Sequence, residues 1–154
     1  MPLEVLSVAS EAVPLVKTGG LADVVGALPA ALAGEGVRVT TLLPGYSQVL
    51  ASLPKGKRAI ARWDSLLGTP ARLLAGDLDG HPLLVLDAPA LFVRDGGIYG
   101  NAAGIDWPDN WRRFATLSRA AADIAGGMVK KLRFGLVHAH DWQAGMVPAY
   151  LRFS

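Results

Sequence analysis

Lys17-Thr18-Gly19-Gly20-Leu21-Ala22-Asp23 connects a short apolar run, Val5 to Ser10, with a helical pattern that opens near Gly20. A loop of this kind at the carboxyl end of a buried strand is where open α/β sheets bind their ligands. The paired glycines leave room for a ligand to approach the backbone, and the N-terminus of a helix attracts phosphate. Lys17 adds a full positive charge, so the segment predicts an anion site at the first βα turn. It matches neither of the standard nucleotide-binding fingerprints.

The residues that follow predict a strand–helix–strand unit. Apolar residues recur at helical spacing and glycines then end the pattern; these are Leu21, Val24, Val25, Leu28 and Leu32, followed by Gly34 and Gly36. Pro29 lies inside the pattern and should kink the helix, because it cannot donate a hydrogen bond to Val25. Val37 to Leu43 is typical of a second buried strand. A strand, a helix and a strand in this order form a right-handed βαβ unit.

The middle of the chain predicts antiparallel strands. Three short segments have a strand-like composition: Lys57 to Trp63, Ala71 to Gly76 and Pro82 to Leu86. Asp79-Gly80 between the last two is a strong hairpin signal. Arg94 to Pro108 is rich in Gly, Asn and Asp, which predicts a long surface loop, and loops of this length are usually functional or mobile. We therefore expect a small antiparallel excursion at the edge of a parallel sheet.

A long amphipathic helix is expected next, from about Trp111 towards Met128, with Asp109 or Asn110 as its cap. Apolar residues form one side of the predicted helix and arginines lie elsewhere on its surface. The apolar side comprises Trp111, Phe114, Ala115, Leu117 and Ala121, and the arginines are Arg112, Arg113 and Arg119.

The chain closes with a further strand, Leu136 to His140, and a helix from Trp142 to about Arg152 that Asp141 can cap. No repeat, low-complexity segment or linker divides the sequence. The predicted fold class is therefore α/β, with a Rossmann-like parallel sheet, flanking helices and a small antiparallel excursion in a single domain.

Composition excludes several classes of protein. The 154 residues suffice for one domain with a core, and the longest uncharged run, Val39 to Pro54, is too broken to span a membrane. The first residues do not resemble a secretory signal. Cysteine is absent, which fits a cytoplasmic protein. The net charge of +2, with no basic run longer than two residues, argues against nucleic acid as a partner.

Two histidines near the end of the chain raise the alternative of a metal site. His138 and His140 are alternate residues of a predicted strand, so their side chains should point to one side, and Asp141 follows directly. Such a pair can begin a metal site, and a metal-dependent hydrolase built on these three residues is one hypothesis. It needs a further ligand, and the only other histidine is His81. The competing interpretation is a buried histidine bonded to backbone, with Asp141 as a helix cap.

Two longer motifs carry a family resemblance. The run Ser10 to Pro29 resembles the N-terminal signature of bacterial glycogen synthases and plant starch synthases, and Val137 to Trp142 resembles a second signature of that family. The spacing between the two motifs also fits. Minor patterns between them match as well, namely Leu86-Asp87-Ala88-Pro89, Asp109-Asn110 and Arg113-Phe114. The resemblance covers essentially the whole chain.

The resemblance implies the N-terminal domain of a GT-B glycosyltransferase, which transfers glucose from ADP-glucose to the non-reducing end of an α-1,4-glucan with retention and without a metal or other cofactor. It makes Asp141 the candidate catalytic residue and Lys17 the contact to the nucleotide sugar. The other expected substrate-binding residues are Thr18, Gly19, Gly20, Asp23, Tyr99, His140, Trp142 and Gln143. Gln143 departs from the family, since many members have histidine there, and a glutamine cannot carry a charge.

The resemblance further implies that residues 1–154 are an incomplete N-terminal domain, without the C-terminal nucleotide-binding domain, and inactive alone. The residues that choose among ADP-, UDP- and GDP-glucose would lie in that second domain. A truncated sheet would expose an edge strand and invite self-association. A non-catalytic module that binds a glucan or a partner protein is the remaining alternative.

Overall fold

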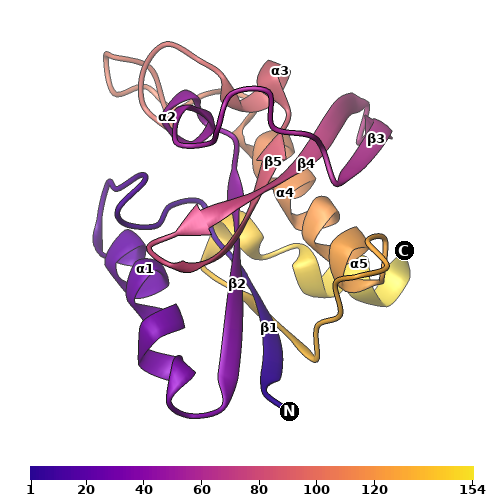
Figure 1. Cartoon of the computed structure of the whole chain (residues 1–154). Helices are drawn as coiled ribbons and strands as arrows, with labels where there is room; N and C mark the ends of the chain where they lie inside the picture. Colours follow the sequence, from indigo (N-terminus) through magenta and orange to yellow (C-terminus); the bar gives the residue numbers. More distant parts are fainter.

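Six strands form one mixed sheet in the computed structural model, which describes residues 1–154, and their order is β3-β4-β5-β2-β1-β6 (Figure 1). Four neighbouring strands are parallel: β1 Leu3–Val8, β2 Val37–Pro44, β5 His81–Asp87 and β6 Leu136–Ala139. Two antiparallel strands, β3 Ala61–Leu66 and β4 Thr69–Leu78, extend the sheet beyond β5. The predicted parallel sheet with an antiparallel excursion is confirmed.

Helices cover the sheet on both sides. Helix α1, Gly20–Ala33, lies on one side, and α4, Asn110–Ala125, and α5, Val147–Phe153, lie on the other (Figure 1). Short helices α2, Ser47–Ala51, and α3, Pro89–Phe92, follow β2 and β5 and were not predicted. None of the helices combines the length and apolar character that crossing a membrane requires.

The predicted βαβ unit of β1, α1 and β2 is confirmed, with Val5 opposite Val39 in the register of the parallel pair. Helix α1 continues through Pro29 to Ala33, and it buries Ala22, Val25 and Pro29. Val24 was predicted to join this apolar side but is 53% exposed. The prediction was wrong there because adjacent helical residues are about 100° apart, so Val24 points away once Val25 faces the sheet.

Two tight turns build the antiparallel excursion. Asp79 and Gly80 connect β4 to β5 with φ of 50° and 85°, as the sequence predicted. Leu67 and Gly68 make a similar turn between β3 and β4, with φ of 48° and 84°. The sequence did not reveal this second turn, and the strand predicted at 57–63 instead occupies Ala61–Leu66. A leucine with positive φ is uncommon, so Leu67 at the first position of this turn gave no turn signal in the sequence.

Helix α4 buries Phe114, Leu117 and Ala121 as predicted, but its buried side differs from the prediction at two positions. Trp111 is 72% exposed and Arg113 is buried, whereas the reverse was predicted. The Arg113 guanidinium is hydrogen-bonded inside the protein, since Nε donates to the Leu91 carbonyl oxygen at 2.7 Å and Nη1 to that of Ile98 at 2.8 Å. Asp109 occupies the predicted cap position, but its carboxylate pairs with Arg94 instead of capping the helix.

The last predicted helix is two elements. Trp142–Ala144 form a single 3₁₀ turn that ends at Gly145, and α5 begins at Val147. The single helix predicted from Trp142 to Arg152 is therefore wrong. Pro148 in the first turn of α5 explains the restart, because proline is favourable at a helix start and cannot donate to the preceding turn.

Gly26 gives a test of how closely α1 packs on the loop before it. A Cβ at this position would lie 2.4 Å from Val13 Cγ2 and 2.5 Å from the Val13 carbonyl oxygen. We expect Gly26→Ala to lower the free energy of unfolding by about 1–3 kcal/mol, because the backbone cannot move aside. Denaturant unfolding measures this. Gly34→Ala is the control, since a Cβ there meets nothing within 4 Å; equal stability of the two variants would contradict this packing.

Candidate functional site

The four parallel strands end at one edge of the sheet, which we term the crest. Backbone hydrogen bonds join the segments that leave it: Ala9 N donates to the Leu42 oxygen at 3.2 Å, and His140 N donates to the Val8 oxygen at 2.9 Å. Segments from distant parts of the chain therefore meet at the crest. This is the edge at which open parallel sheets bind ligands.

A buried carboxylate, Glu11, organises the first loop of the crest. Its oxygens accept hydrogen bonds from Thr18 Oγ1 at 2.5 Å, Thr18 N at 3.3 Å and Gly19 N at 3.1 Å. Tyr99 OH donates to Glu11 Oε2 at 2.8 Å from the loop between α3 and α4. Glu11 is only 1% exposed, so these donors replace water around its charge.

The surroundings of Glu11 keep it ionised. Burial by itself would raise the pKa of this carboxyl, but the hydrogen bonds from Thr18, Tyr99 and Gly19 outweigh burial and lower the pKa below its ordinary value. Burial raises the pKa of the Tyr99 hydroxyl, which therefore stays protonated and donates. Sequence reasoning missed Glu11 as a site residue. The available signal was an acid directly after an apolar strand, in a position where a solvent-facing residue is not expected.

The glycine loop, Lys17 to Gly20, leaves open space at the start of α1. A Cβ on Gly19 or Gly20 would meet nothing within 4 Å, and Gly19 has extended backbone with φ −158°. Neither glycine is therefore needed for the packing of the chain itself. No side chain caps α1, so its N-terminus is free to receive an anion.

Lys17 lies in this loop and pairs with Asp23 in the first turn of α1. Its Nζ donates to the two carboxylate oxygens at 2.7 and 2.9 Å. Both side chains are about half exposed, at 52% and 55%. An exposed ion pair of this kind contributes at most about 1 kcal/mol to the stability of the fold. An incoming anion can therefore compete with Asp23 for the Lys17 ammonium.

His138 and His140 lie on the same side of β6, as predicted, with ring centroids 3.9 Å apart. His140 is buried and its Nε2 lies 3.0 Å from Ser7 Oγ. Burial, with a smaller contribution from the nearby His138, lowers the pKa of His140 to about 4. His81 begins β5 at the opposite edge of the sheet, and no three potential ligands gather anywhere in the chain. The metal-dependent hydrolase hypothesis therefore lacks its further ligand.

Asp141 and Trp142 stand at the end of β6 in an unusual conformation. Asp141 has φ 60° and ψ −172°, and its Oδ1 accepts a hydrogen bond from Trp142 N at 2.8 Å, so it caps the turn as predicted. A non-glycine residue in this region costs on the order of 1–3 kcal/mol and is found most often at functional sites. Asp141 is exposed, and its carboxylate remains accessible at the crest.

The Trp142 ring packs against a buried aromatic side chain. Its ring is 56% exposed and meets Phe114 edge-on at a centroid distance of 5.3 Å, while Phe114 also contacts the Tyr99 ring at 5.9 Å. The structure thus brings Tyr99 and Trp142 into contact with the same buried ring. Gln143 is buried, and its side-chain oxygen has no hydrogen-bond partner.

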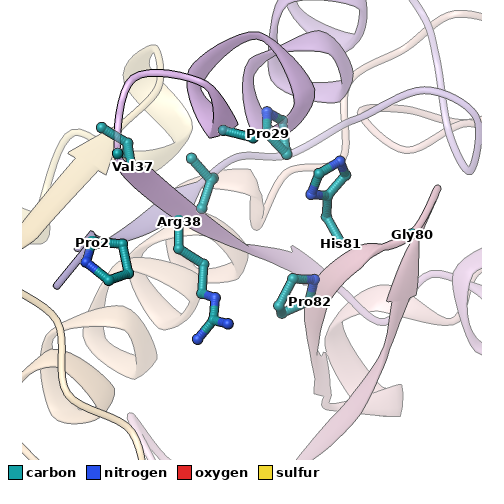
Figure 2. Close-up of a pocket in the computed structure, with 10 residues that line it drawn as sticks. Pro2, Pro29, Val37, Arg38, Gly80, His81 and Pro82 are labelled. Carbon is teal, nitrogen blue, oxygen red and sulfur yellow. The ribbon is translucent and has the colours of Figure 1, made fainter.

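One sizeable hollow of the surface lies away from the crest. It has a volume of about 630 Å³ and is lined by Pro29, Arg38, His81 and Pro82 at the edge where β2 and β5 begin. Figure 2 shows His81 directed towards Pro29 of α1, whereas Arg38 extends the other way. Arg38 is paired with Glu4 at 3.2 Å. No sequence-predicted site residue lines this hollow.

Comparison with known proteins gives consistent matches. The family described as "Starch synthase catalytic domain" matches residues 4–154. Glycogen synthase of Novosphingobium aromaticivorans is 66% identical over 154 residues, which are 100% of this chain and 32% of that protein. Glycogen synthase 1 of Rhizobium meliloti is 57% identical, over 99% of this chain and 32% of that protein. The chain thus spans about a third of the relatives it matches.

A solved structure is also similar. It is the catalytic domain of Starch Synthase IV from Arabidopsis thaliana bound to ADP and acarbose, with a TM-score of 0.72 and 27% sequence identity. The match covers 99% of this chain and 32% of the plant chain. The GT-B-type fold predicted for the N-terminal domain agrees with this similarity.

The role of Glu11 can be measured by its replacement. We expect Glu11→Gln to lower the free energy of unfolding at pH 7 by about 2 kcal/mol, because charge-assisted hydrogen bonds to Thr18 and Gly19 weaken. The folded-state pKa lies below the ordinary value of 4.5, so the stabilisation is present above pH 4.5 and is lost as pH falls through the folded pKa. The difference in the free energy of unfolding between Glu11→Gln and the parent should therefore shrink as pH falls. Glu35→Gln, which alters an exposed acid, is the control, and equal effects of the two would contradict the role.

His140 should titrate with a midpoint near pH 4 in an NMR titration of its ring, well below its ordinary pKa of 6.5. The folded protein therefore binds this proton less readily than the unfolded chain. The contribution of His140 to stability is fully present above pH 6.5 and declines as pH falls towards 4. A midpoint at pH 6 or above would show that the ring is not buried against Ser7.

Proposed function

Because the chain belongs to the starch synthase catalytic domain family, we propose that it is the N-terminal part of a glycogen synthase. The enzyme would transfer glucose from ADP-glucose to the non-reducing end of an α-1,4-glucan with retention. Relatives named glycogen synthase at 66% and 57% identity support this function. The plant neighbour bound to ADP and acarbose is consistent with nucleotide-sugar and glucan binding.

One observation carries the proposal: the glycine loop offers an uncapped helix N-terminus, side-chain-free space at Gly19 and Gly20, and the Lys17 ammonium together. These are the features that a leaving nucleoside diphosphate needs, because its negative charge grows as the bond to glucose breaks. Thr18 takes part through its backbone and hydroxyl bonds to Glu11, which hold the loop in this open shape. We propose that Asp23 orients Lys17 until the donor arrives.

The residues after β6 are proposed to face the reacting sugar and the glucan. Asp141 is the proposed catalytic residue, since it is exposed at the crest in a strained backbone conformation. Trp142 offers a half-exposed aromatic face that suits the apolar side of a sugar ring. His140, neutral at pH 7 because its pKa is about 4, is proposed to position the segment through Ser7. Tyr99 and Gln143 complete the set assigned to substrate binding.

The chain spans about a third of its relatives, and we propose that a second, nucleotide-binding domain supplies the other half of the site. The crest would then form one wall of a cleft between two domains. In this proposal residues 1–154 alone bind ligands weakly and do not turn over ADP-glucose. The cytoplasmic location, the absence of a membrane or nucleic-acid partner and self-association through the β6 edge stay predictions.

Lys17→Ala in the full-length enzyme tests the proposal. We expect the KM for ADP-glucose to rise by about tenfold or more, because a charge-assisted contact to the diphosphate is lost. Stability should change by less than about 1 kcal/mol, since the Lys17–Asp23 pair is exposed. Lys130→Ala is the matched control, because Lys130 is an exposed lysine far from the crest.

Two outcomes would contradict the proposal. An unchanged dependence on ADP-glucose in Lys17→Ala would remove this lysine from the donor site. Robust glucan elongation from ADP-glucose by residues 1–154 alone would show that the reaction does not need a second domain. Retention of glucan with no response to ADP-glucose, in the full-length protein, would indicate a non-catalytic binding module instead.

A further inference from the structure

A cluster of unpaired positive charge extends from the segment after α2 into the start of β3. Lys55, Lys57, Arg58 and Arg62 fall within eight residues that contain no acid. None of the four takes part in an ion pair of the structure. Figure 1 shows this segment running from α2 to β3 at the end of the molecule that also holds α3. Concentrated charge that the fold does not neutralise is a feature to be explained by a partner.

Two of these lysines line a hollow of about 550 Å³. Gly56 separates them with a φ of 71°, so the chain turns tightly there and both flanking lysines border the same space. Apolar side chains form part of its wall, namely Leu50, Leu53, Leu74 and Pro89. A volume of this size falls within the range of small-molecule sites, and the hollow shares no residue with the glycine loop.

The guanidinium of Arg72 is a fixed polar group in the wall of this hollow. Arg72 Nε and Nη2 both donate to Asp87 Oδ2, at 2.9 and 2.5 Å, and Asp87 is only 4% exposed. The Nη1 group of Arg72 has no hydrogen-bond partner within the chain, and the side chain is 42% exposed. Arg62 lies directly opposite Arg72 in the register of β3 and β4. Like charges directly opposite each other destabilise a sheet, although Arg62 itself lines a second hollow that shares Arg72 and Asp87 with this one.

Charge and shape together select the ligand. Lys55, Lys57 and Arg72 outnumber the one carboxylate of the hollow, that of Asp87, and leave an excess of two positive charges. A phosphate dianion matches that excess, and guanidinium and ammonium groups are its usual partners. The space exceeds a bare phosphate and its leucine wall suits the apolar side of a sugar. We propose that this hollow binds a small sugar phosphomonoester through Lys55, Lys57 and Arg72 Nη1.

The test is binding of glucose 6-phosphate to the 154-residue chain, measured by calorimetric titration at constant ionic strength. Saturable one-site binding is expected, and Lys55→Gln/Lys57→Gln should weaken it about tenfold, as the loss of two charge-assisted contacts requires. Both lysines are exposed, so we expect the double variant to keep the fold. The matched control is Lys130→Gln/Lys131→Gln, which removes the same charge from two exposed lysines elsewhere and should bind like the parent.

Inorganic phosphate and glucose serve as the two partial ligands. Weaker binding of phosphate than of glucose 6-phosphate supports the proposal, whereas equal binding would overturn it, because the sugar would then contribute nothing to affinity. Equal binding of uncharged glucose would overturn the proposal. So would the absence of saturation, or an equal loss in both double variants, since either would reduce the effect to general charge attraction. ADP-glucose is absent throughout, so the result is independent of the glucosyltransferase proposal.

Discussion

A buried carboxylate that must find donors is the constraint from which the crest follows. Glu11 lies in the loop after β1 with almost no contact to water, and an unpaired charge in that position would cost several kcal/mol. It obtains its donors from the backbone and hydroxyl of Thr18, from Gly19 and from Tyr99. The glycine loop and the loop before α4 are therefore held to one another through a single side chain.

A buried cation supports the same region from the other side. Arg113 of α4 binds the carbonyl oxygens of Leu91 and Ile98 and lies 5.4 Å and 5.2 Å from the ring centroids of Phe92 and Phe114. These contacts tie the loop before α4 to the helix layer, so Tyr99 reaches Glu11 from a fixed position. The buried polar side chains Glu11 and Arg113 thus form hydrogen bonds that hold the loops of the crest in place. The Lys17 ammonium and the Trp142 ring, in contrast, are about half exposed and face outwards.

Local patterns predicted much of the fold. The apolar run of β1 and the periodicity of α1 gave the βαβ unit, and Asp79-Gly80 gave the hairpin, because these features depend only on neighbouring residues. The pattern failed at Trp111 and Arg113, since it assumes that aromatic rings face inwards and charges face outwards. Arg113 is buried because distant carbonyl groups, from α3 and the following loop, surround it.

The sequence by itself determined the family and the fold class, and it determined that His138 and His140 share one side of their strand. Each of these depends on residue order or on a strand period of two. Only the tertiary structure decided that Glu11 holds the glycine loop and that Tyr99, 88 residues away, donates to it. The physical reason is that a hydrogen bond between distant segments depends on the path of the whole chain, which no local pattern contains.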